Sequence, residues 1–249
     1  MKIKSFFYIA FSILISFNSL AQNKERKFKI HTLAFYNLEN LFDTINDVNK
    51  NDEASPIMEI KFNRGNIYKQ KVTNMARVIS EIGYDVTNRP PTIIGICEVE
   101  NRNVVEDLIA NEKLSKYNYG IVHYDSPDRR GIDVGLLYNK DIFKVINSNS
   151  HVLYINYNNT SDRSFTRDQL VVSGKLDGEL IHLIVNHWPS RGADETKRMA
   201  AAEVNNSIID SLRKIHNNPK IITMGDFNDD PFDKSIKKIL GAKKKIKDV

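Results

Sequence analysis

Residues 91 to 101 have the sequence Pro-Thr-Ile-Ile-Gly-Ile-Cys-Glu-Val-Glu-Asn. The part that ends at Cys97 is short, apolar and rich in β-branched residues, which predicts a strand buried within a sheet. Two acids, Glu98 and Glu100, follow where the apolar run ends. Side chains that leave neighbouring strands at the same edge of a sheet can converge, so these acids mark that edge as a candidate site. Cys97, the single cysteine, is best interpreted as a small buried hydrophobe.

The pattern of apolar residues on either side predicts an α/β protein. Apolar positions recur at helical spacing from Ile67 to Ile82, after a polar loop over 43–65. Further helices are expected over Val104–Leu114, Ala193–Ile215 and Phe232–Leu240. Short apolar segments between turn residues predict strands over Phe28–Tyr36, Tyr119–His123, Val134–Tyr138, Phe143–Ile146, His151–Ile155, Leu170–Leu176, Ile181–Val185 and Lys220–Met224. This order predicts a four-layer αββα sandwich, in which two mixed, mostly antiparallel sheets are flanked by helices.

The N-terminus has the three parts of a secretory signal peptide. Lys2 and Lys4 form a positive region, an apolar run extends from Phe6 to Phe17, and small residues precede the expected cleavage site. The apolar run is too short to span a bilayer, which needs about 20 apolar residues. We therefore expect residues 1–21 to be a signal peptide and residues 22–249 to be an exported domain, periplasmic or extracellular, without a stable membrane anchor.

Size, cysteine content and charge restrict the nature of the exported domain. A chain of 249 residues suits one large α/β domain. Its single cysteine cannot form an intramolecular disulfide, so its stability must come from its core. The net charge of +5 owes much to seven lysines between Lys234 and Lys247, a run that is typical of a solvated helix face. We find no strip of interleaved aromatic and basic residues of the kind that selects nucleic acid.

Four polar clusters stand where expected strands end. Taken singly, each has an ordinary structural explanation. An asparagine can cap a turn, an acid can precede a helix, a lone histidine can belong to a core, and an Asp-x-Asn pair can bond its own backbone. The clusters are Phe35-Tyr-Asn-Leu-Glu-Asn40, Ile96-Cys-Glu-Val-Glu-Asn101, Val185-Asn-His-Trp-Pro-Ser-Arg191 and Met224-Gly-Asp-Phe-Asn-Asp-Asp230.

Together the four clusters supply the groups that metal-assisted hydrolysis of a phosphate ester needs. Mg²⁺ takes oxygen ligands and usually needs only one or two carboxylates, which suits Glu98 with the amide of Asn37. Asp226 can orient or deprotonate the attacking water. Asn228 and His187 can donate hydrogen bonds to the phosphoryl oxygens.

Five motifs follow one another along the chain. They are Asn-x-Glu-Asn-Leu-Phe from Asn37, Gly-Ile-Cys-Glu-Val-Glu-Asn from Gly95, Arg-Arg-Gly-Ile-Asp-Val-Gly-Leu-Leu-Tyr from Arg129, Asn-His-Trp-Pro-Ser-Arg from Asn186 and Gly-Asp-Phe-Asn-Asp from Gly225. In this order they resemble the endonuclease/exonuclease/phosphatase (DNase I-like) family. The resemblance extends from Phe28 to about Phe232, which is nearly all of the expected exported domain.

The resemblance implies a role for each matching residue. Asn37 and Glu98 would form the metal side of the site. His187 would contact the phosphate or the leaving group. Asp226 and Asn228 would be the catalytic pair that activates water and orients the phosphate.

Three further residues are candidates for binding the phosphate of the substrate. Arg130 and Asp133 lie in a stretch that matches one near the family's active site, although this stretch also suits a surface hairpin turn. Arg130 and Arg191 carry guanidinium groups, which match phosphate bidentately. Glu39 and Glu100 rank second to the proposed metal-side residues.

One departure from the family's pattern concerns the end of the chain. The family completes its site with a late aspartate and an Asp-His pair on a final strand, whereas no histidine follows Asn228 here. The last histidine is His216, upstream of the Gly-Asp-Phe-Asn motif. We therefore expect the last strand or strands of the sandwich to be missing, and the activity of this chain to be lower than that of an extended form.

Three functional hypotheses follow. The first is an exported, monomeric nuclease that hydrolyses DNA or RNA with Mg²⁺, for which Mn²⁺ could substitute, with Ca²⁺ as a possible structural ion. The second is a phosphatase or phospholipase acting on sugar, inositol or lipid phosphates, because the family covers all of these. The third is a non-catalytic fragment that only binds metal and phosphate. Substrate specificity lies in loops, so the shared motifs do not separate the first two.

Overall fold

The computed structural model describes residues 28–156 and 162–243 of the chain. Its contacts divide the chain into two units, Met1–Ile30 and His31–Val249, and every helix and strand within the described ranges belongs to the second unit. The expected signal peptide, residues 1–21, lies outside the described residues. Among the residues that are described, no helix combines the length and the apolar character needed to cross a membrane.

The first sheet has the strand order β1-β2-β4-β3. Its strands are β1 (Leu33–Leu41), β2 (Ile93–Val99), β4 (Asp133–Asn139) and β3 (Tyr119–His123). Strands β1 and β2 run parallel, whereas β4 is antiparallel to both β2 and β3. Strand β2 lies between two neighbours and is buried from Ile93 to Cys97, as its apolar run predicts.

The second sheet has the strand order β10-β9-β8-β5 and repeats this arrangement. Its strands are β10 (Lys220–Asp226), β9 (Glu179–His187), β8 (Gln169–Leu176) and β5 (Phe143–His151). Strands β10 and β9 run parallel, and β8 is antiparallel to both β9 and β5. A separate short hairpin consists of β6 (Ile155–Asn156) and β7 (Arg163–Ser164). Each large sheet therefore has one parallel and two antiparallel pairings, which confirms the expected mixed, mostly antiparallel sheets.

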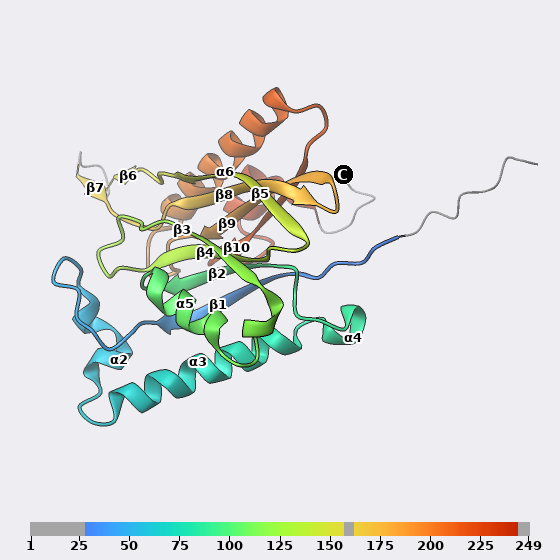
Figure 1. Cartoon of the computed structure of the whole chain (residues 1–249). Helices are drawn as coiled ribbons and strands as arrows, with labels where there is room; N and C mark the ends of the chain where they lie inside the picture. The colour runs from blue at the N-terminus through green and yellow to red at the C-terminus, as the bar shows by residue number, and fades with distance from the viewer. Residues whose placement is uncertain (1–27, 157–161, 244–249) are drawn as a thin grey trace, which may run out of the picture. The chain divides into compact units, whose positions relative to one another are not determined.

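Helices cover the outer faces of the two sheets, as Figure 1 shows. Helices α3 (Arg64–Glu81) and α5 (Arg102–Ala110) share a buried apolar cluster with the first sheet. Helix α6 (Glu195–Ile215) packs on the second sheet through Ile208, which clusters with Val171 and Ile184. The layers follow the order αββα, which confirms the expected four-layer sandwich.

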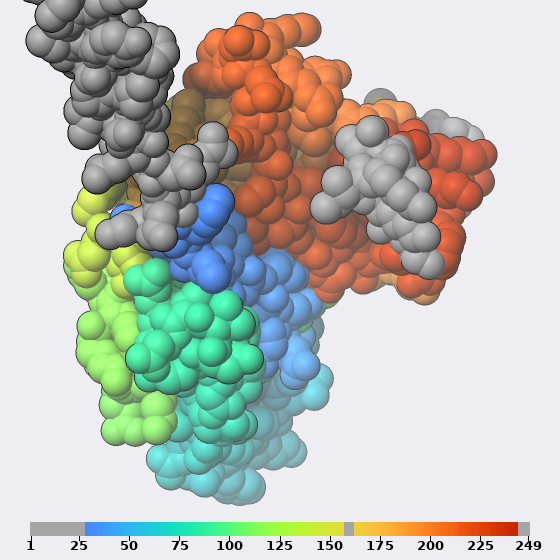
Figure 2. Space-filling model, turned by 90° about the vertical axis from the view of Figure 1, so that its right-hand side faces the viewer, coloured from blue at the N-terminus to red at the C-terminus, as the bar shows by residue number. Residues whose placement is uncertain are grey.

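The two halves of the chain build the two sides of this sandwich. In Figure 2 the first half, coloured blue to green, and the second half, coloured orange to red, occupy separate parts of the visible face. Shorter helical turns connect the main elements. They are η1 (Asp52–Ala54), α2 (Pro56–Glu59), α4 (Tyr84–Thr87), η2 (Ser115–Tyr117) and the π-helical turn η3 (Ser235–Ile239).

The layer between the two sheets is apolar. Side chains alternate along each strand, so that in β9 Leu183 and Val185 face this layer while Ile184 faces α6. Cys97 lies in the same layer, fully buried, and burial raises the pKa of its thiol well above the usual range. A thiol in this setting is inert, which agrees with its interpretation as a small hydrophobe.

Two of the long helices begin at side-chain caps. Asn101 accepts a hydrogen bond from the Val104 N–H at 3.1 Å at the start of α5. Asp194 does the same for the Thr196 N–H at 2.9 Å at the start of α6. Each cap satisfies a backbone donor that the helix itself leaves without a partner. The stretch that begins at Pro91 thus contains a strand, its terminal acids and the cap of the next helix.

Several boundaries differ from the sequence-based expectation. The first strand is Leu33–Leu41 and not Phe28–Tyr36, because its pairing with β2 begins at Leu33. The polar loop over 43–65 contains η1 and α2. Residues expected as a strand over His151–Ile155 are divided between the end of β5 and β6. The last helix is only the short turn η3, because the segment before it is held in a turn by Asp230 and Asp233.

Candidate metal centre

The C-terminal ends of the two parallel strand pairs meet at one end of the inter-sheet layer. In the first sheet Asn37 of β1 is in register with Cys97 of β2. In the second sheet Asp226 of β10 is in register with His187 of β9. Strand β10 contacts β1 and β2 across the layer. Because parallel strands end at the same edge, side chains from four distant parts of the sequence come together there.

Strand alternation directs three of these side chains into the layer between the sheets. The residues two positions before Asn37, His187 and Asp226 all pack in the inter-sheet core. Residues two apart on a strand share a face. The three polar side chains therefore continue the inward-facing rows of their strands, at the point where the apolar core ends.

Glu98 reaches the same place through a β-bulge. Against β4 the register of β2 shifts between Cys97 and Val99, and Glu98 has a left-handed φ of 59°. On the other side of β2, strand β1 has its own irregularity between Asn37 and Leu41. In a regular strand Glu98 would face the helices, where Val99 packs instead. A non-glycine residue in this conformation costs about 1–3 kcal/mol, and such strain is typical of functional sites.

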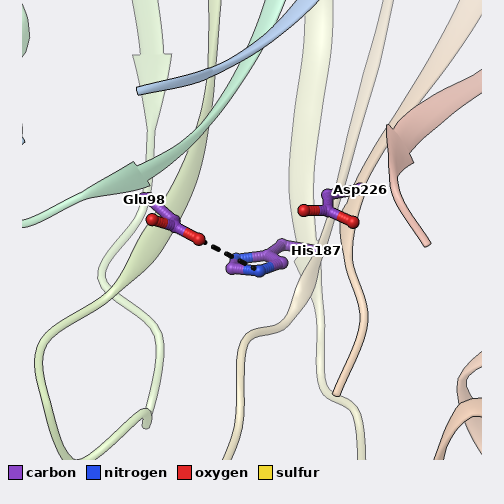
Figure 3. Close-up of side chains that lie close together, drawn as sticks. All are labelled: Glu98, His187 and Asp226. Atoms are coloured by element: carbon purple, nitrogen blue, oxygen red, sulfur yellow. Dashed lines mark ion pairs between the residues drawn. The ribbon is translucent and has the colours of Figure 1, made fainter. Parts of the chain in front are cut away.

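Glu98, His187 and Asp226 form a compact group, which Figure 3 shows with the imidazole ring between the two carboxylates. One potential ligand atom from each residue lies within 4.8 Å of the others. His187 Nε2 is 3.7 Å from Glu98 Oε1. The side chain of Glu98 is 19% exposed and that of His187 only 5%, so the acid is open to a ligand from solvent while the ring is buried.

Four hydrogen bonds hold the two carboxylates in place. Asn37 Nδ2 donates to Glu98 Oε1 at 3.0 Å and to Asp226 Oδ2 at 3.1 Å. The Asn40 N–H donates to Glu98 Oε2 at 2.9 Å. The Asn228 N–H donates to Asp226 Oδ1 at 3.0 Å. Hydrogen bonds to ionised acceptors are the strong ones, so these donors orient and stabilise both negative charges.

The pair Asp226 and Asn228 forms a turn as well as part of the site. Besides the backbone bond to Asp226, the side chain of Asn228 donates from Nδ2 to the Trp188 carbonyl at 3.0 Å. The Trp188 N–H in turn donates to the Asp226 carbonyl at 2.9 Å. The turn therefore ties the end of β10 to the end of β9. An amide group carries two hydrogens, so Asn228 keeps donor capacity beyond its bond to Trp188.

Gly225 permits the close approach of β10 to β9. Its φ is 157°, and a Cβ atom at this position would lie 2.3 Å from the carbonyl oxygen of Asn186. A backbone oxygen of a paired strand cannot move aside at low cost, so the position requires glycine. The glycine of the Gly-Asp-Phe-Asn motif thus sets the placement of Asp226.

His187 is neutral at physiological pH. Burial, followed by the charges of Arg167 and Arg130, lowers the pKa of its imidazole from 6.5 to about 2. Its Nδ1 atom is buried and has no hydrogen-bond partner among residues 28–156 and 162–243. A neutral imidazole offers one N–H and one lone pair, so it can donate to a phosphoryl oxygen or bind a metal ion.

The donor set fits a divalent cation. Carboxylates from both sheets face each other, and Asn37 Oδ1 beside them accepts the Glu39 N–H at 2.8 Å, which leaves a second lone pair. Oxygen-rich sets of this kind suit Mg²⁺, Mn²⁺ or Ca²⁺. The residues predicted from the sequence as the metal side, Asn37 and Glu98, are therefore adjacent, and Asp226 joins them.

Two arginines were expected to bind phosphate, and they lie in different surroundings. Arg130 is half-exposed, and its Nε atom lies 3.5 Å from Asp128. Its positive charge contributes to the lowered pKa of His187. Arg191 donates from Nε to the Asn228 carbonyl at 3.1 Å, and its Nη2 atom lies 2.9 Å from Asp230. Arg130 is thus placed to attract an anion to the site, whereas a phosphate at Arg191 would have to displace an acid.

The structure does not bring Asp133 or Glu100 into the group around His187. Asp133 is buried, accepts the Ser126 N–H at 2.7 Å and lies 3.1 Å from His123 Nε2. With His123 and Asp125 it belongs to a second set of potential ligand atoms. Glu100 accepts a backbone N–H at 2.7 Å, and burial raises the pKa of its carboxyl to about 7.

Sequence analysis did not indicate Arg167, which lies beside the site. Its side chain is 6% exposed. It donates from Nη1 to Asp128 Oδ2 at 3.2 Å and from Nη2 to the Trp188 carbonyl at 2.6 Å. It therefore holds the residue next to His187 and adds a positive charge there. A buried arginine breaks the usual polar-outside pattern, so periodicity could not have indicated its place.

A buried amide network supports the strand that carries His187. Asn205 of α6 donates to Asn186 Oδ1 at 3.0 Å and to Gln169 Oε1 at 3.1 Å. Trp188 Nε1 donates to Asn186 Oδ1 at 3.1 Å, and Asn186 Nδ2 donates to Thr223 Oγ1 at 3.0 Å. The network joins β8, β9, β10 and α6. Strand alternation was the signal for it, because Asn186 must face away from the site if His187 faces into it.

Solved structures share this fold at low sequence identity. The human Nocturnin catalytic domain with bound sulfate anion is 19% identical, with a TM-score of 0.50 over 67% of this chain and 60% of that chain. An endonuclease/exonuclease/phosphatase family protein from Bacteroides thetaiotaomicron is 16% identical, with a TM-score of 0.55 over 82% and 66%. A mannosyl-6-phosphatase from the same organism is 16% identical, with a TM-score of 0.54 over 84% and 69%. At such identities the likeness concerns the fold.

Sequence comparison identifies the family. No curated protein sequence matches this chain. The model of the Endonuclease/Exonuclease/phosphatase family matches residues 32–249, which include all four strand ends that form the site. The chain therefore belongs to the endonuclease/exonuclease/phosphatase family.

Proposed function

We propose that this protein is a phosphodiesterase that hydrolyses nucleic acid and depends on a divalent metal ion, with Mg²⁺ as that ion. The observation that carries the proposal is the meeting of Glu98 and Asp226 around the buried His187 where the two sheets join. Membership of the family supports a phosphate ester as the substrate. The positive charges of Arg130 and Arg167 beside His187 favour an anionic substrate.

Each residue has a distinct task in this proposal. Glu98 with Asn37 holds the metal ion, which when bound polarises the phosphoryl group and neutralises its charge. Asp226 accepts a hydrogen bond from the attacking water and takes its proton as the water oxygen bonds to phosphorus. The bond from phosphorus to the leaving oxygen breaks, and that oxygen takes a proton from solvent. His187, as a neutral donor, and the second amide hydrogen of Asn228 stabilise the charge that develops on the phosphoryl oxygens.

The proposal includes export and action as a monomer. Support for export comes from the three-part N-terminal sequence over residues 1–21. The mass of the protein recovered from the periplasm or medium tests it: cleavage after Ala21 is expected, and recovery of the intact chain from the cytoplasm alone contradicts it. Light scattering of the purified protein tests the monomer.

A substrate panel tests the enzymatic proposal. It consists of DNA, RNA, bis-p-nitrophenyl phosphate and p-nitrophenyl phosphate, each with Mg²⁺ and with a chelator. We expect the diesters to be hydrolysed with Mg²⁺ and not with the chelator, and Asp226→Asn to lower the rate by about 100-fold or more. The matched control is Asp210→Asn, which removes an exposed carboxylate from α6 and retains the full rate.

Two outcomes contradict the proposal in different ways. A full rate for Asp226→Asn shows that the reaction takes place elsewhere. Hydrolysis of p-nitrophenyl phosphate without hydrolysis of any diester indicates a phosphomonoesterase acting on a sugar, inositol or lipid phosphate.

A further inference from the structure

A basic pocket of about 210 Å³ lies beside the candidate metal centre. Its walls come from the loop before β4, from the β7 region and from the segment that follows β9. The basic residues that line it are Arg129, Arg130, Arg167 and Lys197, and the acid among its lining residues is Asp128. Figure 1 places the β6–β7 hairpin at the end of the sandwich toward which β1 runs.

Basic side chains outnumber acidic ones among the residues that line this pocket. Asp128 is buried and contacts Arg167 at 3.2 Å and Arg130 at 3.5 Å, so one carboxylate serves two guanidinium groups. Two buried atoms that belong to lining residues, Arg167 Nε and Thr166 Oγ1, have no hydrogen-bond partner in the described part of the chain. Buried donors of this kind favour a ligand that brings acceptor oxygens, and an excess of cations favours an anion.

One aromatic side chain, Phe165, lines the same pocket, and a second, Tyr154, lies near it. Phe165 is 40% exposed although it is large and apolar, and Tyr154 nearby is 60% exposed. The guanidinium carbon of Arg129 lies 5.5 Å from the centre of the Phe165 ring, and that of Arg163 lies 4.9 Å from it. Arg163 also lies 5.2 Å from the Tyr154 ring. Arg129 and Arg163 lie over the Phe165 ring, so a base would stack on the exposed side of this cluster of ring and guanidinium planes.

The pocket is linked to the metal centre through one short segment. The Trp188 carbonyl accepts hydrogen bonds from Arg167 in the pocket and from Asn228 in the site, at 2.6 and 3.0 Å. Ser190, which lines the pocket, follows His187 by three residues, and three extended residues span at most about 11 Å. A ligand in the pocket can therefore be continuous with one at His187.

We propose that this pocket binds a phosphate that flanks the scissile phosphate of a single-stranded polynucleotide, with the neighbouring base stacked at Phe165. The proposal rests on the proposed function and specifies its substrate. A second phosphate on a small sugar would satisfy the cations equally well, but it leaves the exposed aromatic rings without a role. A single strand is favoured over a duplex, because a base in a duplex is already paired and stacked. An unpaired base is free to stack on an aromatic or guanidinium side chain.

Binding of a short fluorescent single-stranded oligonucleotide, measured by anisotropy without Mg²⁺, tests the proposal. We expect Phe165→Ala to weaken binding by about tenfold through the loss of stacking. We expect Phe165→Trp to restore it, because the larger ring stacks as well. Arg129→Gln is expected to weaken binding several-fold and to lower the slope of log K against log salt by about 0.7, the value for one phosphate contact.

The matched control and the catalytic measurement complete the test. Arg213→Gln removes an exposed arginine from the last turn of α6 and leaves binding and its salt slope unchanged. In hydrolysis with Mg²⁺, Phe165→Ala and Arg129→Gln raise the KM of the oligonucleotide more than they raise that of bis-p-nitrophenyl phosphate, which carries only one phosphate.

The outcomes separate this proposal from the proposed function. Native binding by both Phe165→Ala and Arg129→Gln overturns the subsite, even if diesters are hydrolysed normally. Equal competition by a sugar bisphosphate, with no effect of Phe165→Ala, overturns the polynucleotide as its ligand. If the native protein hydrolyses no diester but the variants weaken strand binding as expected, the proposed function fails while the subsite stands.

Discussion

The link between metal binding and stability offers a test of the site that does not depend on catalysis. Replacing Glu98 by glutamine removes one of the two facing carboxylates and keeps the shape of the side chain. In a chelator the native chain has two negative charges within 4.8 Å of each other. With a saturating divalent cation the same charges become its ligands. The substitution should therefore destabilise the protein mainly when the metal ion is bound.

The magnitudes follow from the geometry. Two unit charges 4.8 Å apart repel by about 3.5 kcal/mol at an effective dielectric constant of about 20. Glu98→Gln relieves this repulsion but weakens the hydrogen bonds that Asn37 and Asn40 donate to the carboxylate, each worth about 1.5–3 kcal/mol because the acceptor is charged. The two effects nearly cancel, so without metal the variant and the native chain differ little in stability. A metal ion at 100 times its Kd stabilises the native chain by about 2.7 kcal/mol, which raises Tm by roughly 5–10 °C for a chain of this size.

Thermal unfolding in a chelator, in Mg²⁺ and in Mn²⁺, at matched ionic strength, measures both effects. We expect Glu98→Gln to lose more than half of the metal-induced rise in Tm. Glu106→Gln removes an exposed carboxylate from α5 and keeps the full rise. A full rise in the Glu98→Gln variant would refute the placement of the metal ion, and so would a native chain whose Tm does not respond to either ion.

Three further predictions concern stability. Gly225→Ala should destabilise the protein by about 3 kcal/mol or more, seen as a lower urea midpoint, because its Cβ meets the Asn186 carbonyl at 2.3 Å; a native midpoint would contradict this. Asp128→Leu should lower the free energy of unfolding by about 3–5 kcal/mol, because it leaves Arg167 buried without its acid. Adding Arg167→Met should restore part of that stability in the same assay. A double variant less stable than the single variant would contradict this reasoning. Burial and a neighbouring histidine lower the pKa of His182 from 6.5, so the unfolded chain binds a proton below pH 6.5 that the folded chain does not. The free energy of unfolding should therefore decrease as pH drops below 6.5. The decrease between pH 7.5 and 5.5 should be smaller in the His182→Gln variant than in the native chain. An equal decrease in both would show that His182 is not responsible.

The features that the sequence predicted well depend on regular alternation. The apolar run before Glu98 predicted a buried strand. His187 is two residues after Val185 on the same strand, so its ring shares the face of Val185 and enters the inter-sheet layer. The order of the motifs then indicated which strand ends meet. Glu98 itself is the exception, because nothing in Cys-Glu-Val-Glu distinguishes a bulge from continued alternation. Only the packing of Val99 against the helices decides that Glu98 turns toward Asp226.

The parts that could not be predicted are those in which distant loops combine. Arg129, Arg163 and Phe165 belong to two segments that no periodicity connects, so the sequence shows no aromatic and basic strip where the structure has a cluster. The position of Arg167 depends on its pairing with Asp128. Such pairings join residues that are far apart in the sequence, so the spacing of residue types along the chain does not indicate them.

The metal centre is a product of the packing between the sheets and not of either sheet alone. Each sheet supplies one parallel pair of strands and one carboxylate, and Asn37 of the first sheet bonds to Asp226 of the second at 3.1 Å. Glycine at position 95 leaves room for the Met224 side chain of β10 against β2, since a Cβ there would lie 2.8 Å from Met224 Sδ. The distance between the two carboxylates is therefore set by the thickness of the apolar layer behind them. Changes deep in that layer should alter metal affinity as well as stability, which makes the core itself part of the site.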